Sequence, residues 1–227
     1  MAMETFNKKL AIILIGPPGS GKDTQAEFLS HEFGFKEVKT SRIIEDKLKS
    51  ADPNDPVMNH ERELFKSGQL NDRELVQKWA TERIEEIGKS GAGLIGNGWP
   101  RKISEAEIEI STVEKFYPKE AIKVISIDIS EEESVKRNSR RRVCEKNGHP
   151  ILDTQENQGI TVCPEDGSPI IIRGDDSPET IKKRYGIYIS DTKPVLDFLN
   201  KRGYNIITIN GEQSIEEIHR DILDKLW

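Results

Sequence analysis

Cysteine and long hydrophobic runs are both scarce in this sequence, and each shortage excludes a class of protein. Two cysteines among 227 residues, Cys144 and Cys163, cannot build a disulfide framework, which fits a reducing compartment. No stretch approaches the roughly 20 apolar residues that a membrane helix needs. The polar segment 1–9 and the short apolar run Leu10–Ile15 do not make a secretory signal peptide. We therefore expect a cytoplasmic protein with no membrane partner.

Basic residues are fewer than acidic ones, with 34 Lys and Arg against 40 Asp and Glu and a formal net charge of -6. An extended nucleic-acid surface normally shows a basic excess, so nucleic acid is not an expected partner. One local cluster is strongly basic and comprises Lys136, Arg137, Arg140, Arg141 and Arg142. Such a run is commonly a solvated helix face, but in an acidic protein it also suits a small anionic ligand.

Short apolar runs alternate with helical patterns along the chain. The runs expected to be buried strands are Leu10–Ile15, Phe35–Val38, Ala92–Ile95, Ile122–Ile129 and Asn205–Ile209. The helical patterns are Asp23–Phe33, Asp72–Ile87 and Ser177–Asn200. This alternation predicts an α/β fold in which a parallel five-stranded sheet is covered on both faces. Two regions interrupt it: 40–87 is helical with a break at 51–56, and 143–173 is rich in Gly, Pro, Asn and Asp with short β-like pieces.

The segment 16–22 (GPPGSGK) fits the pattern G-x-x-x-x-G-K. It lies directly after a buried strand and before a helix, the context that separates a phosphate-binding loop from an ordinary glycine-rich turn. Backbone N–H groups of such a loop point at phosphate oxygens, and Lys22 adds a full positive charge. The motif therefore indicates binding of a nucleoside triphosphate. The position after the lysine usually carries the Ser or Thr that ligates magnesium; here it is Asp23, and a hydroxyl follows as Thr24.

Four ordered motifs resemble those of one enzyme family. The run GPPGSGKDTQA resembles G-x-P-G-x-G-K-G-T-Q, and segment 97–101 (NGWPR) resembles D-G-F-P-R. Segment 137–143 (RNSRRRV) resembles an arginine-rich entry to a lid. The stretch from Arg173 to Arg184 resembles R-x-D-D-x-x-E-T-x-x-x-R, which closes that lid. These are the motifs of adenylate kinases, and the resemblance covers 10–226.

The resemblance implies an architecture and an activity. The architecture is a P-loop NTPase-type core domain (1–39, 88–142 and 174–227), a helical NMP-binding insertion (40–87) and a small β lid (143–173). The activity is Mg²⁺-dependent, reversible transfer of the γ-phosphoryl group of ATP to a nucleoside monophosphate, first of all AMP (ATP + AMP = 2 ADP), by a monomer. Phosphoryl transfer needs in-line positioning and neutralised oxygens, which accounts for the arginines.

Roles for individual residues follow from the same resemblance. Lys22 would bind the ATP phosphates, Arg101 the acceptor phosphate, and Arg184 the transferring group. The ATP-binding candidates are Gly19, Ser20, Gly21, Lys22, Asp23, Thr24, Arg137 and Arg141. The acceptor-binding candidates are Thr40, Arg42, Glu45, Gly98, Arg101, Glu105, Arg173 and Arg184. The catalytic candidates are Lys22, Arg101, Arg141, Arg173 and Arg184.

The acceptor site departs from the family pattern. Where the family reads T-G-D-x-x-R, segment 40–45 reads TSRIIE, so Glu45 stands in place of the arginine that grips the AMP phosphate. Arg42 lies three residues earlier on the same helix face and could supply the missing charge, whereas Glu45 would repel a phosphate. The family aspartate that helps to order the magnesium shell is Asn97 here. We hypothesise that Asp23 restores that carboxylate from the other side.

The choice of base is open for a similar reason. The family glutamine that reads adenine is Glu105 here, and a carboxylate only accepts hydrogen bonds. It suits a guanine edge at least as well as adenine, unless it merely starts an exposed helix. The alternatives are therefore a kinase for GMP, UMP/CMP or dTMP, and a catalytically weakened nucleotide-binding regulatory protein. The retained arginines argue against the second.

The lid segment contains the arms C-x-x-N-G and C-x-x-D-G, where some adenylate kinases bind zinc. Asparagine is a poor zinc donor, so one ligand is degraded. The ligand candidates for a structural zinc ion are Cys144, Cys163, Asp166 and His149. The competing interpretation is a metal-free lid with two unused thiols.

Overall fold

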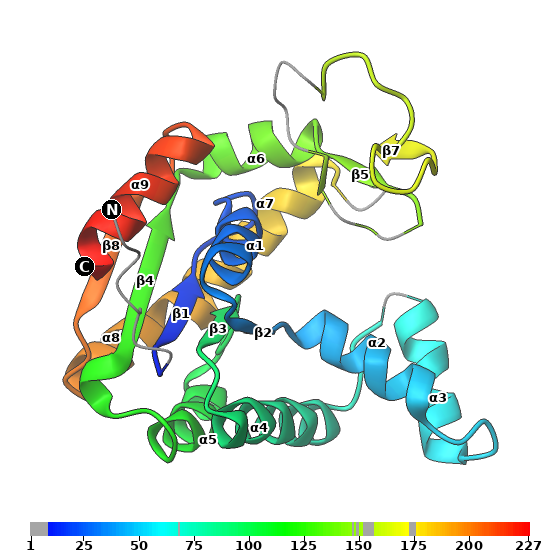
Figure 1. Cartoon of the computed structure of the whole chain (residues 1–227). Helices are drawn as coiled ribbons and strands as arrows, with labels where there is room; N and C mark the ends of the chain where they lie inside the picture. Colours follow the sequence, from blue (N-terminus) through cyan, green and yellow to red (C-terminus); the bar gives the residue numbers. More distant parts are fainter. Residues whose placement is uncertain (1–8, 68, 147, 149, 152–156, 173–175) are drawn as a thin grey trace.

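A five-stranded parallel sheet forms the centre of the molecule (Figure 1). The computed structural model describes residues 9–67, 69–146, 148, 150–151, 157–172 and 176–227. The strands of the sheet are β1 (Ala11–Ile15), β2 (Lys36–Val38), β3 (Leu94–Asn97), β4 (Ile122–Asp128) and β8 (Ile206–Asn210). Their order is β2-β3-β1-β4-β8 and every pair is parallel. All five carboxyl ends therefore meet at one edge, where ligands of such sheets bind.

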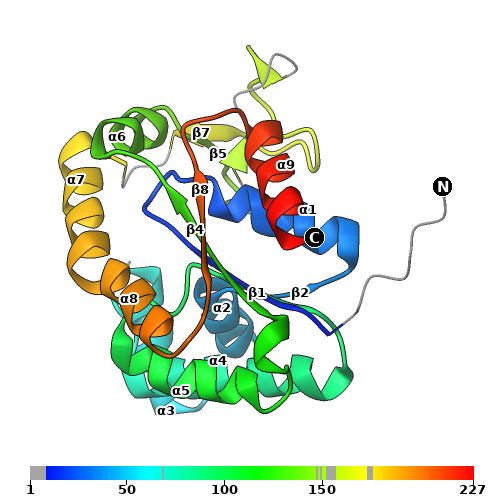
Figure 2. The ribbon, with the colours of Figure 1, turned by 90° about the vertical axis from the view of Figure 1, so that its left-hand side faces the viewer.

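Helices cover both faces of this sheet, as the sequence predicts. Figure 2 shows α1 (Lys22–Phe33) and α9 (Ile215–Leu226) on one face, and α4 (Arg73–Ser90), α5 (Ile103–Glu114) and α8 (Lys193–Lys201) on the other. Alternate residues of β1 point to opposite sides. Thus Ile12 and Leu14 pack with α1 and α9, while Ala11, Ile13 and Ile15 pack with the other three helices. The predicted fold class is confirmed.

The first interruption of the alternation is helical. α2 (Thr40–Ser50) and α3 (Pro56–Lys66) are separated at the predicted break, and Asp55 caps α3 by accepting from Val57 N and Met58 N. A further break precedes α4, where Asp72 accepts from Leu75 N. Within α4, four residues belong to the same hydrophobic cluster as β1: Trp79, Ala80, Ile84 and Ile87. The domain boundary at 87 stays a prediction.

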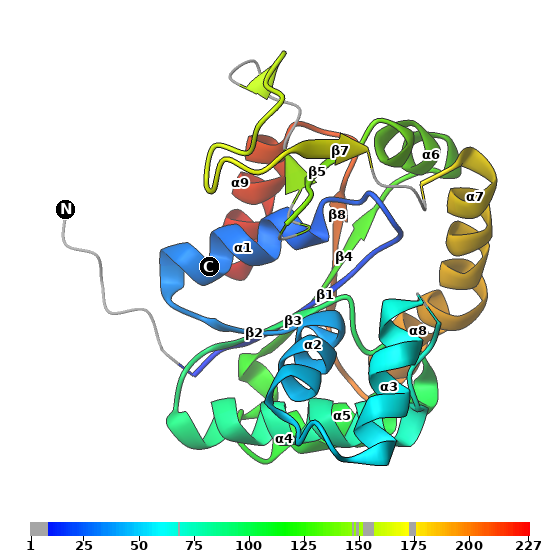
Figure 3. The same ribbon diagram turned by 90° about the vertical axis from the view of Figure 1, so that its right-hand side faces the viewer.

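The second interruption is a small antiparallel sheet between α6 (Glu131–Ser139) and α7 (Pro178–Ile187). Its strands are β5 (Arg142–Cys144), β6 (Pro150–Ile151) and β7 (Ile170–Ile172), in the order β6-β5-β7. Figure 3 shows this sheet at the top of the molecule, with α2 and α3 at the bottom. The two interruptions of the sequence pattern therefore lie at opposite ends of the structure.

The single helix expected over Ser177–Asn200 is instead two helices joined by a π-helical turn, Tyr188–Thr192. Pro194 has no N–H to continue the α-helical ladder. Lys193 N donates to Tyr188 O, five residues earlier, which widens the turn. A short 3₁₀ turn, Lys119–Ala121, precedes β4. No helix in the described residues is long and apolar enough to cross a membrane.

Candidate active site

The segment 16–22 forms the connection from β1 to α1, as predicted. Gly19 and Gly21 have φ angles of 78° and 88°, a region that favours glycine. A Cβ on Gly19 would lie 2.5 Å from Asn138 Nδ2, and one on Gly16 would lie 2.6 Å from Ile127 O. Among the described residues no side chain caps the N-terminus of α1, so the loop presents backbone N–H groups suited to an anion.

The other predicted ATP-binding residues of this segment lie beside the loop. Ser20 is buried, and its Oγ has no hydrogen-bond partner among the described residues. Lys22, Asp23 and Thr24 form the first turn of α1, where Thr24 is buried. Their placement agrees with the sequence prediction, although contact with ATP stays a prediction.

Lys22 lies in a strongly electropositive setting. Its Nζ donates to Pro17 O at 3.3 Å. Burial lowers the pKa of Lys22 to about 8. The negative charge of Asp23 acts to raise this pKa, whereas three nearby positive charges lower it further, those of Arg101, Arg184 and Arg141. A Cβ on Gly98 would lie 3.2 Å from Lys22 Cε and 3.8 Å from Arg101 Nη2. Cations from four separate segments therefore face one region beside the loop, which is what a polyphosphate requires.

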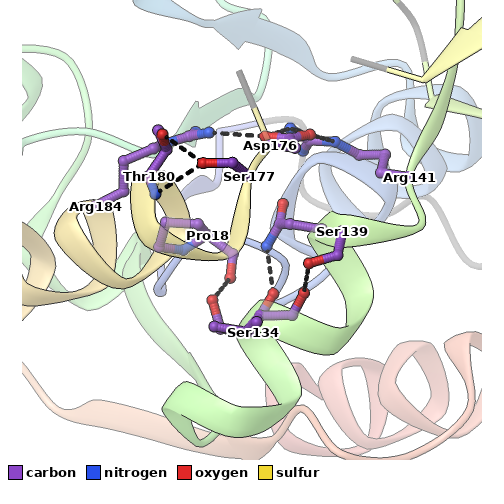
Figure 4. A network of polar contacts seen from close by, with 10 residues as sticks. Pro18, Ser134, Ser139, Arg141, Asp176, Ser177, Thr180 and Arg184 are labelled. Atoms are coloured by element: carbon purple, nitrogen blue, oxygen red, sulfur yellow. Dashed lines mark hydrogen bonds and ion pairs between the residues drawn. The ribbon is translucent and has the colours of Figure 1, made fainter. Parts of the chain in front are cut away.

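Asp176 holds two of these cations. Arg141 donates to both of its oxygens, with Nη2 2.7 Å from Oδ2, and Arg184 Nη1 lies 3.2 Å from Oδ1. The Asp176 side chain is 0% exposed. Figure 4 shows the two arginines reaching it from opposite sides. Because a buried carboxylate fixes both guanidinium groups, they are oriented before any ligand arrives. Arg173, predicted to join them, lies outside the described residues.

Arg137 lies against the phosphate loop from α6. Its Nη1 donates to Gly19 O at 3.3 Å, and its Nε donates to Glu133 Oε1 at 2.8 Å. The arginine cluster seen in the sequence is thus divided between two tasks near the same loop: Arg137 contacts the loop and Arg141 contacts Asp176.

Asp23 and Asn97 touch, as the hypothesis of a relocated carboxylate requires. Asn97 Nδ2 donates to Asp23 Oδ1 at 3.0 Å and to Glu37 Oε1 at 2.7 Å. Lys39 Nζ lies 2.7 Å from Asp23 Oδ1. Burial alone would raise the pKa of Asp23, but the charges of Lys22 and Lys39 outweigh it and hold that pKa below its usual range. An ionised carboxylate therefore lies beside Lys22.

The predicted acceptor residues on α2 are more exposed than the arginines around Asp176. Thr40 begins α2, and Arg42 and Glu45 are exposed on it. Glu45 Oε1 pairs with Lys49 Nζ at 2.6 Å, four residues on. Arg42 has no hydrogen-bond or ion-pair partner within the described part of the chain. Among the described residues, Lys47 and Lys49 of α2 are paired with Glu82 and Glu45, so the positive charge of α2 without a partner there is that of Arg42.

Glu105 also has a local partner. Its Oε2 accepts from Arg101 N at 2.9 Å, while Arg101 Nε donates to Gly98 O at 2.9 Å. Glu105 thus holds the backbone just before the N-cap residue of α5. The contact uses one carboxylate oxygen and leaves base selection a prediction.

Three candidate zinc ligands converge at the small antiparallel sheet. Each of these residues offers one ligand atom, and the three atoms lie within 4.8 Å of one another; the residues are Cys144, Cys163 and Asp166. Both cysteines are buried, and Ser168 Oγ donates to Asp166 Oδ1 at 2.6 Å. Two sulfurs and a carboxylate are donors that zinc accepts. The fourth candidate, His149, lies outside the described residues.

Several residues of the site were not predicted to have a role. Glu133 had a usable signal, because it lies four residues before Arg137 on one helix. Asp176 was seen within a motif, but its partner Arg141 is 35 residues away. Lys39 and Glu37 carried no local signal at all, since they reach Asp23 and Asn97 only across the sheet edge.

Comparison with known proteins gives consistent results. The family model described as adenylate kinase matches residues 14–204. The chain is 31% identical over 221 residues to the adenylate kinase of Petrotoga mobilis, covering 96% of this chain and 97% of that one. It is 32% identical over 218 residues to that of Staphylococcus epidermidis, covering 95% and 98%. It is 30% identical over 222 residues to that of Bacillus subtilis, covering 95% and 97%.

Proposed function

Because the chain belongs to the adenylate kinase family, we propose that it transfers the γ-phosphoryl group of ATP reversibly to AMP. The observation that carries this proposal is the convergence of Lys22, Arg101, Arg141 and Arg184 beside the phosphate loop. Phosphoryl transfer asks a protein for positioning and charge neutralisation rather than covalent chemistry. This group of cations supplies both.

On the ATP side, backbone N–H groups of 19–24 and Lys22 bind the phosphates, and Arg137 approaches from α6. Asp176 keeps Arg141 and Arg184 oriented, so little side-chain entropy is lost when the transferring group arrives. Arg173 joins this clamp. The same proposal includes a monomeric state, a cytoplasmic location and a division into three parts. These parts are a core (1–39, 88–142 and 174–227), an acceptor-binding insertion (40–87) and a lid (143–173).

Magnesium, when bound with ATP, would neutralise charge on the phosphate oxygens. We assign Asp23 to its outer ligand shell. Support comes from the ionised state of Asp23 and from its contact with Asn97. Asp23→Gly should raise the Mg²⁺ concentration needed for half-maximal ATP affinity, and adding Asn97→Asp should reverse the change. An Asp23→Gly protein with unchanged Mg²⁺ dependence would contradict the assignment.

On the acceptor side, Arg101 and Arg42 bind the AMP phosphate near Thr40 and the Gly98 backbone. The Glu45–Lys49 pair weakens the repulsion expected from Glu45. Glu105 reads the base with the oxygen that its contact to Arg101 N leaves available. Glu105 also favours a second candidate, a kinase for another monophosphate, since a carboxylate pairs well with guanine.

A structural zinc ion in the lid completes the proposal, supported by the three converging ligands. Metal analysis of purified protein should find about one zinc per chain by the ligand count of such sites. Cys163→Ser should lose the metal and lower the melting temperature. Wild-type protein purified with zinc present but holding none would identify a metal-free lid.

The activity is tested by incubating purified protein with ATP and Mg²⁺ and, separately, AMP, GMP, UMP, CMP or dTMP, while diphosphate formation is followed. Turnover of AMP alone supports the proposal. Turnover of another monophosphate would retain the kinase activity but identify that monophosphate, instead of AMP, as the acceptor. ATP binding without any turnover identifies a nucleotide-binding regulatory protein.

A further inference from the structure

Helix α6 is attached to the phosphate loop by one of its faces. Ser134 Oγ donates to Pro18 O at 2.7 Å, and Arg137 Nη1 donates to Gly19 O at 3.3 Å. A Cβ on Gly19 would lie only 2.5 Å from Asn138 Nδ2, so the Asn138 side chain also lies against the loop. Positions three and four residues apart share a helix face, so Ser134, Arg137 and Asn138 form one surface against the loop. Figure 4 shows Ser134 of α6 reaching the Pro18 carbonyl.

The direction of a carbonyl determines the direction of the next N–H group. In a trans peptide the C=O and the following N–H point in opposite directions. The cis bond of the described chain is Trp99–Pro100, so the bond between Pro18 and Gly19 is trans. Ser134 draws Pro18 O toward α6 and thereby directs Gly19 N–H away from α6. Ser20 N, by contrast, donates to Pro17 O within the loop at 3.2 Å.

Gly19 N–H has no acceptor within the described part of the chain. It lies in a segment whose other N–H groups and Lys22 suit an anion. Ser134, in turn, is 0% exposed and cannot contact a ligand held above the loop. We propose that Ser134 is a positioning residue, which aims Gly19 N–H at a phosphate oxygen of ATP by holding the Pro18 carbonyl. This inference rests on the proposed function only in taking ATP as the occupant of the loop.

The chain offers a matched control within the same helix. Ser139 Oγ donates to Val135 O at 2.7 Å, the same length and chemistry as the Ser134 bond, but the acceptor lies inside α6 (Figure 4). Both Ser134→Ala and Ser139→Ala delete one hydroxyl-to-carbonyl hydrogen bond made by α6. They differ in whether that bond reaches the phosphate loop.

The test measures ATP affinity by calorimetry without any acceptor, together with the amide ¹H–¹⁵N shift that ATP induces at Gly19. We expect Ser134→Ala to weaken ATP binding roughly fivefold, as loss of one hydrogen bond does, and to reduce the shift at Gly19. Ser139→Ala should change neither. Ser134→Thr, which keeps the hydroxyl, should recover most of the affinity. Melting temperatures of all variants separate these effects from lost stability.

Equal losses of ATP affinity in Ser134→Ala and Ser139→Ala would overturn the inference, because α6 stability would then explain them. So would wild-type affinity and an unchanged Gly19 shift in Ser134→Ala. The proposed function fails differently: a wild-type chain that binds ATP but phosphorylates no monophosphate loses that function, while the Ser134 comparison still stands. A wild-type chain that binds no ATP overturns both.

Discussion

The proposed ATP side and the proposed acceptor side of this site are built in different ways. On the ATP side, Arg141 and Arg184 share the fully buried Asp176, and α6 holds the loop through Ser134 and Arg137. On the acceptor side, Glu45 pairs one helical turn away with Lys49, and Arg42 is exposed without a partner among the described residues.

This difference in burial determines at which positions of such a site a substitution costs little stability. Substituting a buried ion-pair member leaves an uncompensated charge, which costs several kcal/mol, about 3–5. Exposed helix positions carry little of the fold, and surface substitutions usually fall within about 0.5 kcal/mol. The family arginine at position 45 is accordingly replaced by a glutamate on exposed α2, while the predicted arginines of the ATP side are retained. The phosphate loop departs from the family pattern at Asp23, whose side chain is 42% exposed.

The largest effect should come from Lys22→Met. Removing the cation beside the loop should lower kcat/KM at least about 100-fold, the usual cost of deleting one electrostatic donor to a transition state. Steady-state kinetics with ATP and AMP provide the measurement. Lys36→Met, at an exposed lysine of β2, is the control and should retain activity. If kcat/KM of Lys22→Met stays within a few-fold of the wild-type value, Lys22 is not an essential cation of the ATP side.

Glu109, a buried carboxyl on α5, lies four residues after Glu105. It is 5% exposed, and its Oε2 has no partner in the described part of the chain. Burial, aided by the charge of Glu105, raises the pKa of Glu109 to about 8. A raised acid pKa means that its stabilising contribution is complete below the ordinary value near 4.5 and is lost as pH rises toward 8.

Glu109→Gln should therefore increase the free energy of unfolding at pH 7 by about 2 to 3 kcal/mol. It should also flatten the fall in stability between pH 5 and pH 8. Urea unfolding at three pH values measures both. Glu107→Gln, at an exposed position of the same helix, should leave the profile unchanged. If Glu109→Gln and wild type have parallel profiles, Glu109 is not the group that titrates.

ATP affinity should weaken with rising pH. Lys22 is charged below its pKa of about 8 and loses that charge above it. If the charged form binds the phosphates, the Kd for ATP should be about tenfold larger at pH 9 than at pH 7. Calorimetry at saturating Mg²⁺ measures the change, and Lys22→Met should remove it. A flat wild-type profile would assign ATP affinity to the arginines instead.

Arg42→Ala should have the smallest of these effects on catalysis. Loss of one exposed charged contact should raise the KM for AMP about tenfold or less and leave the KM for ATP unchanged. Lys66→Ala removes an exposed charge from the neighbouring helix α3 and serves as the control. An unchanged KM for AMP in Arg42→Ala would show that Arg42 does not replace the arginine missing at position 45.

The sequence by itself determined the features that depend on residues close along the chain. Five apolar runs predicted the five strands, most clearly β1, β3 and β4, because a strand buried on both faces is apolar nearly throughout. The phosphate loop was recognisable because its glycines, its lysine and the flanking strand and helix are contiguous. The break before α3 was visible in its Asp and Pro residues, which cap and start helices.

Only the tertiary structure decided which distant side chains meet. Three hydrogen bonds join residues far apart in the sequence: Asn97 to Asp23 over 74 residues, Arg141 to Asp176 over 35, and Ser134 to Pro18 over 116. The link between Asp23 and Asn97 was suggested only by the family pattern, whereas many carboxylates and carbonyl oxygens in the sequence had suitable chemistry for Arg141 and Ser134. The choice among them depends on how the parallel strands bring their carboxyl ends together and how α6 packs beside the loop. Local spacing carries no information about either, because both follow from packing of the whole chain.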